Sequence, residues 1–232
     1  MRYKEFERIV SKKRLSRYVQ ACGGDTRRAM ILYRYNIELS QIMFAIICHF
    51  EVALRNAVDD ILTVRLGSEW LNNSASPGGV FDSQATRRDY NNVKKEYDKL
   101  QKSGLYSHSK LLASMEFGFG KYQFAPAQYA CTKKSLMKVF PNKARSSAKQ
   151  KYNLSYIFNE LDRINTLRNR IAHHEPICFP KQASIIYTDY ITNEYQKMMQ
   201  LFCWMGINGK DLLLGLDHVQ QICLKIDKLK PQ

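Results

Sequence analysis

The sequence predicts an all-α protein, and three observations lead to this prediction. Apolar residues recur at helical spacing through most of the chain, no segment alternates apolar and polar residues for long, and proline occurs only six times in 232 residues. Steps of three and four residues place side chains on one face of a helix, whereas a half-buried strand needs a period of two. With 45% apolar residues, a chain of this length can also bury a substantial core.

The first strong helical pattern begins after two glycines, where Asp25 can act as the N-cap of "TRRAMILYRYN". The longest pattern covers residues 37–66 and places Leu39, Met43 and Ile46 among the apolar residues of one face. The opposite face is apolar as well, through Phe44, Cys48 and Val52. A helix that is apolar on two sides is expected to be central and buried.

The second part of the chain begins with a loop rich in Ser, Gly and Pro at residues 72–82. It is the one candidate for an internal boundary, and we otherwise expect residues 1–232 to form a single domain. A polar helix is predicted over residues 83–104, and a short helix running into a Gly-aromatic turn over residues 109–124. The last strongly periodic helix begins at Leu154.

The charge of the chain is strongly positive, with 36 Lys and Arg against 21 Asp and Glu, a formal net charge of +15. Such a surplus favours a polyanionic partner, above all nucleic acid. A basic protein with no such partner and a membrane surface are the alternatives. Residues 133–151 hold the sharpest basic run, which is either a solvated loop or a strip that contacts RNA phosphates. We call these residues the basic strip: Lys133, Lys134, Lys138, Lys143, Arg145, Lys149 and Lys151.

The six cysteines are scattered, form no CxxC pair and sit mostly in apolar helical runs, which is typical of a reducing compartment. The N-terminus is charged throughout and does not resemble a signal peptide. The longest apolar run, "IMFAIICHF", is about half a membrane span. We therefore expect a soluble, cytoplasmic protein with no membrane partner.

A charged cluster, "LRNRIAHHEPI", closes the helix predicted from Leu154. On a wheel that turns about 100° per residue, Arg168 falls between Leu161 and Ile157, within the apolar stripe. Because arginine keeps its charge, burying it without a partner would cost several kcal/mol. Two interpretations are open: Arg168 forms a buried ion pair, with Glu51 as its partner, or the stripe borders a polar cleft at this point.

Two adjacent histidines follow Arg168 in the same cluster. His173 lies about 140° around the helix axis from Arg168, and Asn169 stacks one turn below His173. Pro176 cannot continue the helix, so both histidines fall in its last turn. Taken singly, His174 would be a helix-end cap and His173 a surface histidine near a negative helix terminus.

Arginine and histidine together are the groups that RNA cleavage without a metal requires. The 2′-OH must lose a proton and the 5′-oxygen must gain one, and a histidine can do either near neutral pH. A fixed guanidinium can bind two oxygens of the phosphate while it gathers negative charge. Two copies of the chain across a two-fold axis would supply a pair of each residue. The pattern predicts Arg168 and His173 as catalytic residues of a homodimer.

Several blocks of sequence carry a resemblance to a known family. In chain order they are "RLSRYVQACGGDTRRAMILYRYNIELS", "FEVALRNAV", "MEFGFGKYQF", "KVFP" and "LRNRIAHHEPI", and they cover about residues 14–180. They resemble the Abi-like abortive-infection family (AbiD/AbiF type) of the HEPN superfamily, whose signature is Arg–Asn-x-x-x-His. The chain departs from that pattern at Gly120, where the family has the tryptophan of "FGFW".

The resemblance implies an all-α, HEPN-type helical bundle with additional N-terminal helices. It implies a metal-independent endoribonuclease that acts as a toxin in phage defence and is restrained by a partner, for which we expect a structured small noncoding RNA on the basic strip. Arg168 and His173 match the signature's pair, and Asn169 matches its polar second position. Further family blocks contain residues that either support the site or simply pack: His174, Glu51, Arg55 and Asn56.

Other chemistry has less support in the sequence. A zinc site would need His173, His174, Cys178 and Cys203, yet two adjacent histidines at a helix end rarely bind one tetrahedral ion. No Gly-rich phosphate loop is present, so we expect neither a metal nor a cofactor. The main alternative to the nuclease is a non-catalytic RNA-binding protein with a structural Arg/His site. A DNA-binding regulator is a third interpretation, although the sequence has no helix-turn-helix signature.

Overall fold

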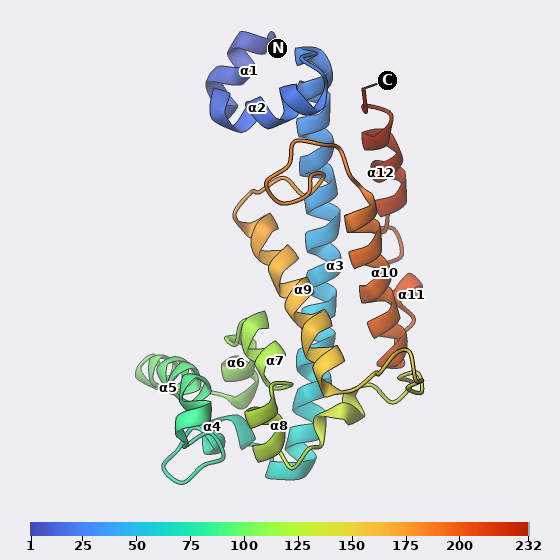
Figure 1. Cartoon of the computed structure of the whole chain (residues 1–232). Helices are drawn as coiled ribbons and strands as arrows, with labels where there is room; N and C mark the ends of the chain where they lie inside the picture. The colour runs from blue at the N-terminus through green and yellow to red at the C-terminus, as the bar shows by residue number, and fades with distance from the viewer. Residues whose placement is uncertain (232) are drawn as a thin grey trace. The chain divides into compact units, whose positions relative to one another are not determined.

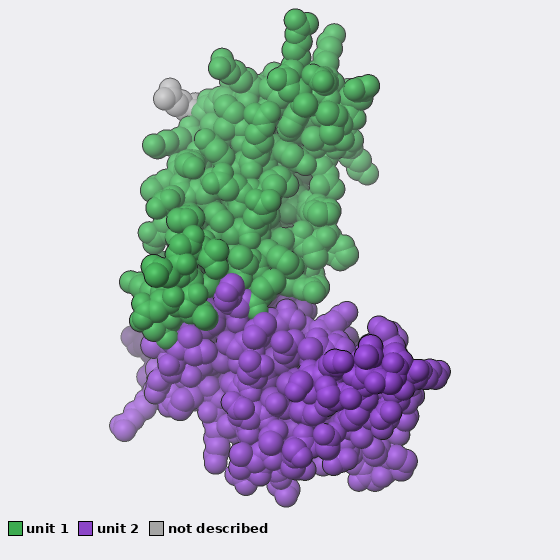
Figure 2. All heavy atoms as spheres, turned by 180° about the vertical axis from the view of Figure 1, so that it is seen from behind, with its two compact units in different colours: residues 1–48, 166–200, 208–232 green, residues 49–165, 201–207 purple. Residues whose placement is uncertain are grey.

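The computed structural model describes residues 1–231 of the chain, and within them every regular element is a helix (Figure 1). The predicted all-α class is therefore confirmed. By its internal contacts the chain divides into two compact units, coloured separately in Figure 2. Unit 1 comprises Met1–Cys48, Thr166–Gln200 and Asn208–Gln232, and unit 2 comprises His49–Asn165 and Leu201–Ile207.

Three helices contribute residues to both units: α3 (Thr26–Leu66), α9 (Leu154–Ala172) and α10 (Asp189–Trp204). The loop at residues 72–82, the boundary candidate from the sequence, lies within unit 2. The division of the chain thus falls inside helices, where composition and loop signals give no indication of it.

Unit 1 holds both ends of the described chain. Besides its shares of the three long helices it contains α1 (Tyr3–Val10), α2 (Lys12–Ala21), α11 (Gly209–Leu212) and α12 (Val219–Asp227). In Figure 1, α12 runs alongside α10, and Asp227 accepts a hydrogen bond from the Thr188 hydroxyl at 2.8 Å. The core of the unit is aliphatic and aromatic, and its fully buried members include Leu15, Leu32, Leu39, Met43, Ile46, Ile177, Phe179, Ile191, Val219 and Ile226.

The start of α3 confirms the cap predicted from the sequence. The Asp25 carboxylate accepts hydrogen bonds from the backbone N–H groups of Arg27 and Arg28, at 2.9 and 3.0 Å. These are two of the donors that a helix N-terminus leaves without partners. Gly23 and Gly24, with φ of 62° and 90°, supply the left-handed backbone of the turn that precedes the cap.

Unit 2 is built from short helices and one longer polar helix. They are α4 (Trp70–Ser74), the 3₁₀ helix η1 (Gln84–Thr86), α5 (Arg87–Lys102), α6 (His108–Ala113), α7 (Phe117–Tyr122), α8 (Pro126–Cys131) and the 3₁₀ helix η2 (Leu136–Val139). Its core is rich in aromatic residues, among them Phe50, Trp70, Phe81, Phe117, Phe124, Phe140 and Phe202.

The Gly-aromatic stretch of unit 2 differs from its prediction. It forms the helix α7 rather than a turn. Phe117 and Phe119 are buried, while Gly118 and Gly120 lie in the helix with nothing within 4 Å of an added Cβ. The structure therefore has room for a side chain at Gly120, the position where the related pattern has tryptophan.

The prediction that α3 is buried on two sides is wrong for its second face. Leu39, Met43 and Ile46 are fully buried, but Phe44 and Val52 are 39% and 46% exposed, and Cys48 is exposed as well. By length and composition alone α3 could cross a membrane, a test that the core helix of a soluble protein also passes. Since one side of α3 is buried within the protein itself, the helix is consistent with a soluble protein.

Candidate functional site

The candidate site lies at the end of α9, within unit 1. Asn153 begins this helix by accepting a hydrogen bond from the Tyr156 backbone N–H at 3.0 Å. At the other end the His174 N–H donates to the Ile171 carbonyl at 2.9 Å, and the Glu175 N–H donates to the Arg170 carbonyl at 2.8 Å. This pair of bonds is the Schellman motif, which needs a left-handed residue just past the helix. His174 takes that position, with φ of 55°, although glycine is the usual choice.

Arg170 is the buried arginine of the cluster, a residue for which the sequence predicts no role. Its side chain is 7% exposed. One of its terminal nitrogens donates to the Pro176 and Phe179 carbonyls, at 2.5 and 3.1 Å, and its Nε lies 3.5 Å from the Glu175 carboxylate. The guanidinium also lies over the Tyr190 ring. Arg170 therefore fixes the chain that follows the two histidines.

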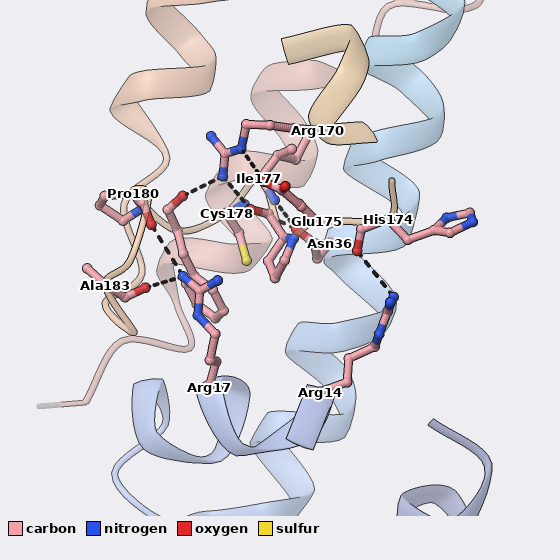
Figure 3. A network of polar contacts seen from close by, with 12 residues as sticks. Arg14, Arg17, Asn36, Arg170, His174, Glu175, Ile177, Cys178, Pro180 and Ala183 are labelled. Atoms are coloured by element: carbon pink, nitrogen blue, oxygen red, sulfur yellow. Dashed lines mark hydrogen bonds and ion pairs between the residues drawn. The ribbon is translucent and has the colours of Figure 1, made fainter. Parts of the chain in front are cut away.

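The segment 174–183 is held by side chains from distant parts of unit 1 (Figure 3). Asn36 of α3 accepts hydrogen bonds from the N–H groups of Ile177 and Cys178, at 2.9 and 3.1 Å. Arg17 of α2 donates to the carbonyls of Pro180 and Ala183 and lies over the Phe179 ring. Arg14, also in α2, donates to the His174 carbonyl at 3.2 Å. A loop held by this many hydrogen bonds is a rigid support for the adjoining histidines.

The predicted catalytic residues have a different environment from Arg170. Arg168 is half-buried and His173 is exposed. Among the described residues, the Arg168 side chain makes one hydrogen bond, a weak one of 3.5 Å from Nη1 to Asn169 Oδ1. Its buried Nε has no hydrogen-bond partner among the described residues. Buried donors are almost always paired, so this one calls for a bound water, an anion or a shift of the side chain.

His174 borders an open apolar depression on unit 1. The depression has a volume of about 350 Å³ and lies between α3 and the end of α9. The side chains that line it are mostly apolar: Ile37, Ser40, Gln41, Phe44, Ile171, Ala172 and His174. The exposed face of α3 thus continues to His174 through Phe44.

The predicted supporting residues of the "EVALRN" block belong to unit 2. Glu51 and Arg55 are half-buried and line a small pocket together with Trp70 and Gly120, while Asn56 is exposed. Since Arg168 belongs to unit 1, the ion pair between Glu51 and Arg168, one of the two interpretations of the sequence, stays untested. The structure groups Asn169 and His174 with the Arg168–His173 pair in unit 1 and carries the "EVALRN" residues in unit 2.

The basic strip is also part of unit 2. Six of its seven side chains are exposed, and Lys143 is half-buried. Lys133 and Lys134 have positive φ angles, of 57° and 54°, so the chain turns sharply where the strip begins. Among the described residues, none of the seven forms an ion pair with a carboxylate. Their charge is therefore available to a partner outside the chain.

The cysteine nearest the motif is poorly suited to metal binding or nucleophilic chemistry. Cys178 is fully buried, and burial raises the pKa of its thiol far above the ordinary value, so it does not form the thiolate that either role needs. His173 and His174, at the Schellman turn itself, are exposed. Within residues 1–231, no three His, Cys, Asp or Glu side chains gather in a way that could hold a metal ion.

Comparison with known proteins adds one finding. The family model described as "Abi-like protein" matches residues 1–178, more than three quarters of the chain. No curated protein and no solved structure matches. The matched range includes the whole motif from Arg168 to Ile177.

Proposed function

The chain belongs to the Abi-like protein family, which implies a part in abortive infection, a defence against phage, and we propose that it acts there as a HEPN-type endoribonuclease. In this proposal the protein is a cytoplasmic toxin that cleaves RNA without a metal. Arg168 and His173 are its catalytic residues, and a structured small noncoding RNA holds it in check. Asn169 and His174 support the pair.

The observation that carries the proposal is a difference between two arginines of one helix: the fold uses the terminal nitrogens of Arg170 but hardly those of Arg168. Arg170 makes the structural contacts: it is buried, bound to two carbonyls and next to a carboxylate. Among the described residues, the Arg168 guanidinium makes a single, weak hydrogen bond. Its buried Nε has no hydrogen-bond partner among them, which is also true of the Arg170 Nε, so the difference between the two arginines lies in their terminal nitrogens. A guanidinium whose terminal N–H groups are largely unused by the fold is suited to bind a phosphate whose charge grows during cleavage.

His173 supplies the proton transfers in this mechanism. Its exposed imidazole stands past the last turn of a helix that is anchored by the buried residues Leu161, Ile164 and Leu167. The attack of a ribose 2′-oxygen on the neighbouring phosphorus breaks the bond to the 5′-oxygen. A histidine that donates a proton to that leaving oxygen lowers the barrier, and a second histidine can accept the proton of the 2′-OH.

The second histidine comes, in our proposal, from a second copy of the chain. The apolar depression beside His174, with the exposed Phe44 at its edge, supports a homodimer that meets across this part of unit 1. A two-fold interface here would bring two Arg168–His173 pairs near one axis. Phe44→Glu is expected to convert a dimer into a monomer in light scattering and to abolish cleavage. Leu224→Glu, an equally drastic change at an exposed leucine of α12, should do neither.

The basic strip supports an RNA partner apart from the substrate. Seven basic side chains with no ion pair inside the described chain can neutralise several phosphates. A folded RNA bound there would restrain the toxin until infection removes it. Purified protein is then expected to carry a discrete RNA, visible as a raised 260/280 nm absorbance ratio and identified by sequencing. Replacing Lys149 and Lys151 by glutamate should release this RNA.

The nuclease itself is tested with three purified variants and a chelator. Wild-type protein, freed of RNA at high salt, is expected to cleave single-stranded RNA in EDTA, whereas His173→Ala and Arg168→Ala leave it intact. His218→Ala is the matched control, since His218 is an exposed histidine outside the site. Equal cleavage by wild type and His173→Ala would contradict the catalytic assignment. RNA binding that persists without cleavage by any variant would favour the non-catalytic RNA-binding protein.

A further inference from the structure

Arg14 lies at the candidate site although it is 154 residues away from Arg168 in the sequence. It belongs to α2, whose buried residues Leu15 and Tyr18 fix the helix against unit 1. Figure 3 shows the Arg14 side chain reaching from α2 to the end of α9, where Nη1 donates to the His174 carbonyl at 3.2 Å. The contact places a guanidinium next to the turn that carries both histidines.

The two arginines of α2 are engaged to different degrees. Arg17 is half-buried, donates to two carbonyls and stacks on the Phe179 ring at 5.2 Å, so its guanidinium is used by the fold. Arg14 is exposed and makes a single hydrogen bond, and no carboxylate among the described residues pairs with it. A guanidinium has five N–H donors, so most of the donors of Arg14 face solvent.

An ordinary helix-end contact does not account for this arrangement well. The His174 carbonyl is at an exposed turn, where water can serve as donor instead, and a cation near an exposed helix C-terminus stabilises the helix only weakly. The hydrogen bond to the His174 carbonyl does have one clear effect, which is to orient the Arg14 guanidinium. The planar guanidinium can donate two parallel hydrogen bonds to two phosphate oxygens, which a lysine ammonium at the same place could not do.

We propose that Arg14 binds a phosphate of the substrate RNA, adjacent to the phosphate that is cleaved, so that α2 forms part of the nuclease site. The inference rests on the proposed function and extends it to a residue outside the Arg–His motif. In this role the bond to His174 holds Arg14 at a fixed distance from the histidine turn. Arg14 contacts the strand and takes no part in the proton transfers.

The test measures binding rather than cleavage, with the full chain carrying His173→Ala. A fluorescein-labelled, single-stranded 12-mer of uridine serves as the probe, and its affinity is followed by anisotropy over a series of salt concentrations. For single-stranded nucleic acid the slope of log K against log salt changes by about 0.7 for each phosphate contact. Arg14→Ala is expected to flatten the slope by about this amount and to weaken binding about ten-fold near physiological salt.

Two further variants control for charge and for folding. Lys13→Ala removes the same charge from the neighbouring exposed residue and should leave the slope within error of the parent protein. Arg14→Lys retains the charge but not the planar guanidinium, and its affinity should lie between that of Arg14→Ala and that of the parent protein. Thermal unfolding of Arg14→Ala is expected within about 2 °C of the parent, since the residue is exposed.

The outcomes separate this proposal from the nuclease assignment. An unchanged slope for Arg14→Ala, or equal changes for Arg14→Ala and Lys13→Ala, would overturn the role of Arg14 even if wild-type protein cleaves RNA. A drop of many degrees in melting temperature, with the slope unchanged, would show that Arg14 serves the fold. A flattened slope specific to Arg14→Ala, together with cleavage by the wild type, supports the proposal. The same slope without cleavage would show that Arg14 binds an RNA phosphate but would overturn its place in a nuclease site.

Discussion

Truncating Arg170 is expected to destabilise the protein far more than truncating Arg168, although the two arginines are neighbours in one motif. The terminal nitrogen of Arg170 makes two hydrogen bonds to the Pro176 and Phe179 carbonyls, from a side chain that is 7% exposed. Hydrogen bonds from a charged donor contribute about 1.5–3 kcal/mol each, and breaking a buried charged network costs about 3–5 kcal/mol. We expect Arg170→Ala to lower the free energy of unfolding by about 3–5 kcal/mol.

Arg168→Ala should cost less than about 1 kcal/mol, because the residue is half-buried and its one contact is 3.5 Å long. Urea denaturation followed by circular dichroism measures both changes. In thermal scans they correspond to a fall of roughly 6–20 °C for Arg170→Ala and under about 4 °C for Arg168→Ala. Arg170→Lys, which retains the charge but not the planar fork, should lie between Arg170→Ala and the wild type.

The result that would refute this reasoning is a loss of stability for Arg168→Ala as large as that for Arg170→Ala. Arg168 would then have a buried partner, and the ion pair with Glu51 that the sequence suggested would become the better interpretation. The Arg–His motif would in that case belong to the fold, which favours a non-catalytic protein. Measuring stability therefore bears on function before any RNA is added.

Three further predictions concern single residues. Gly120→Ala should stabilise unit 2 by about 0.5–1 kcal/mol, measured by urea denaturation, because the added methyl group meets nothing within 4 Å in a helix. His174→Gly should raise the melting temperature by about 2–4 °C, since glycine adopts the φ of 55° without strain; no rise would mean that the imidazole makes a stabilising contact. Burial raises the pKa of the Asp89 carboxyl above 3.8, so the folded state binds its proton more tightly and stability should fall as pH rises from about 4 through the raised pKa. Asp89→Asn, which retains an acceptor for Gln128, should flatten that part of the stability–pH curve.

The helices were predictable from sequence because their signals are local. The Asp25 cap and the apolar spacing of α9 each depend on neighbours within a few residues. The prediction that both histidines lie in the last turn of α9 is wrong, because the helix ends at Ala172 and His174 adopts a left-handed backbone before Pro176 is reached. The exposed second face of α3 was not predictable in the same way. Whether Phe44 is covered depends on where segments distant in sequence come to lie, and periodicity identifies an apolar face without showing what covers it.

At the site, too, the sequence pattern did not show which of the two arginines of the motif is buried. On a helical wheel Arg170 lies about 200° from Arg168, away from the apolar stripe, so the pattern marked Arg168 as the buried residue. Arg170 is instead buried by the loop that follows the helix, and its acceptors are backbone carbonyls, which leave no trace in the sequence. One indication was present in the sequence: Arg170 falls in the last turn of α9, and a basic side chain near a helix C-terminus can bind backbone carbonyls there.

The family match and the structural support of the motif end at different places. The match stops at Cys178, whereas the carbonyls bound by Arg170 and Arg17 include those of Phe179, Pro180 and Ala183. The turn that presents the histidines thus depends on a segment outside the family pattern. A chain can share the motif and still differ in how rigidly it holds His173, and catalysis by a positioned acid or base is sensitive to shifts of about 1 Å. Retention of the motif is therefore a weaker indication of nuclease activity than the motif together with donors such as Arg170 and Arg17 that fix the following loop.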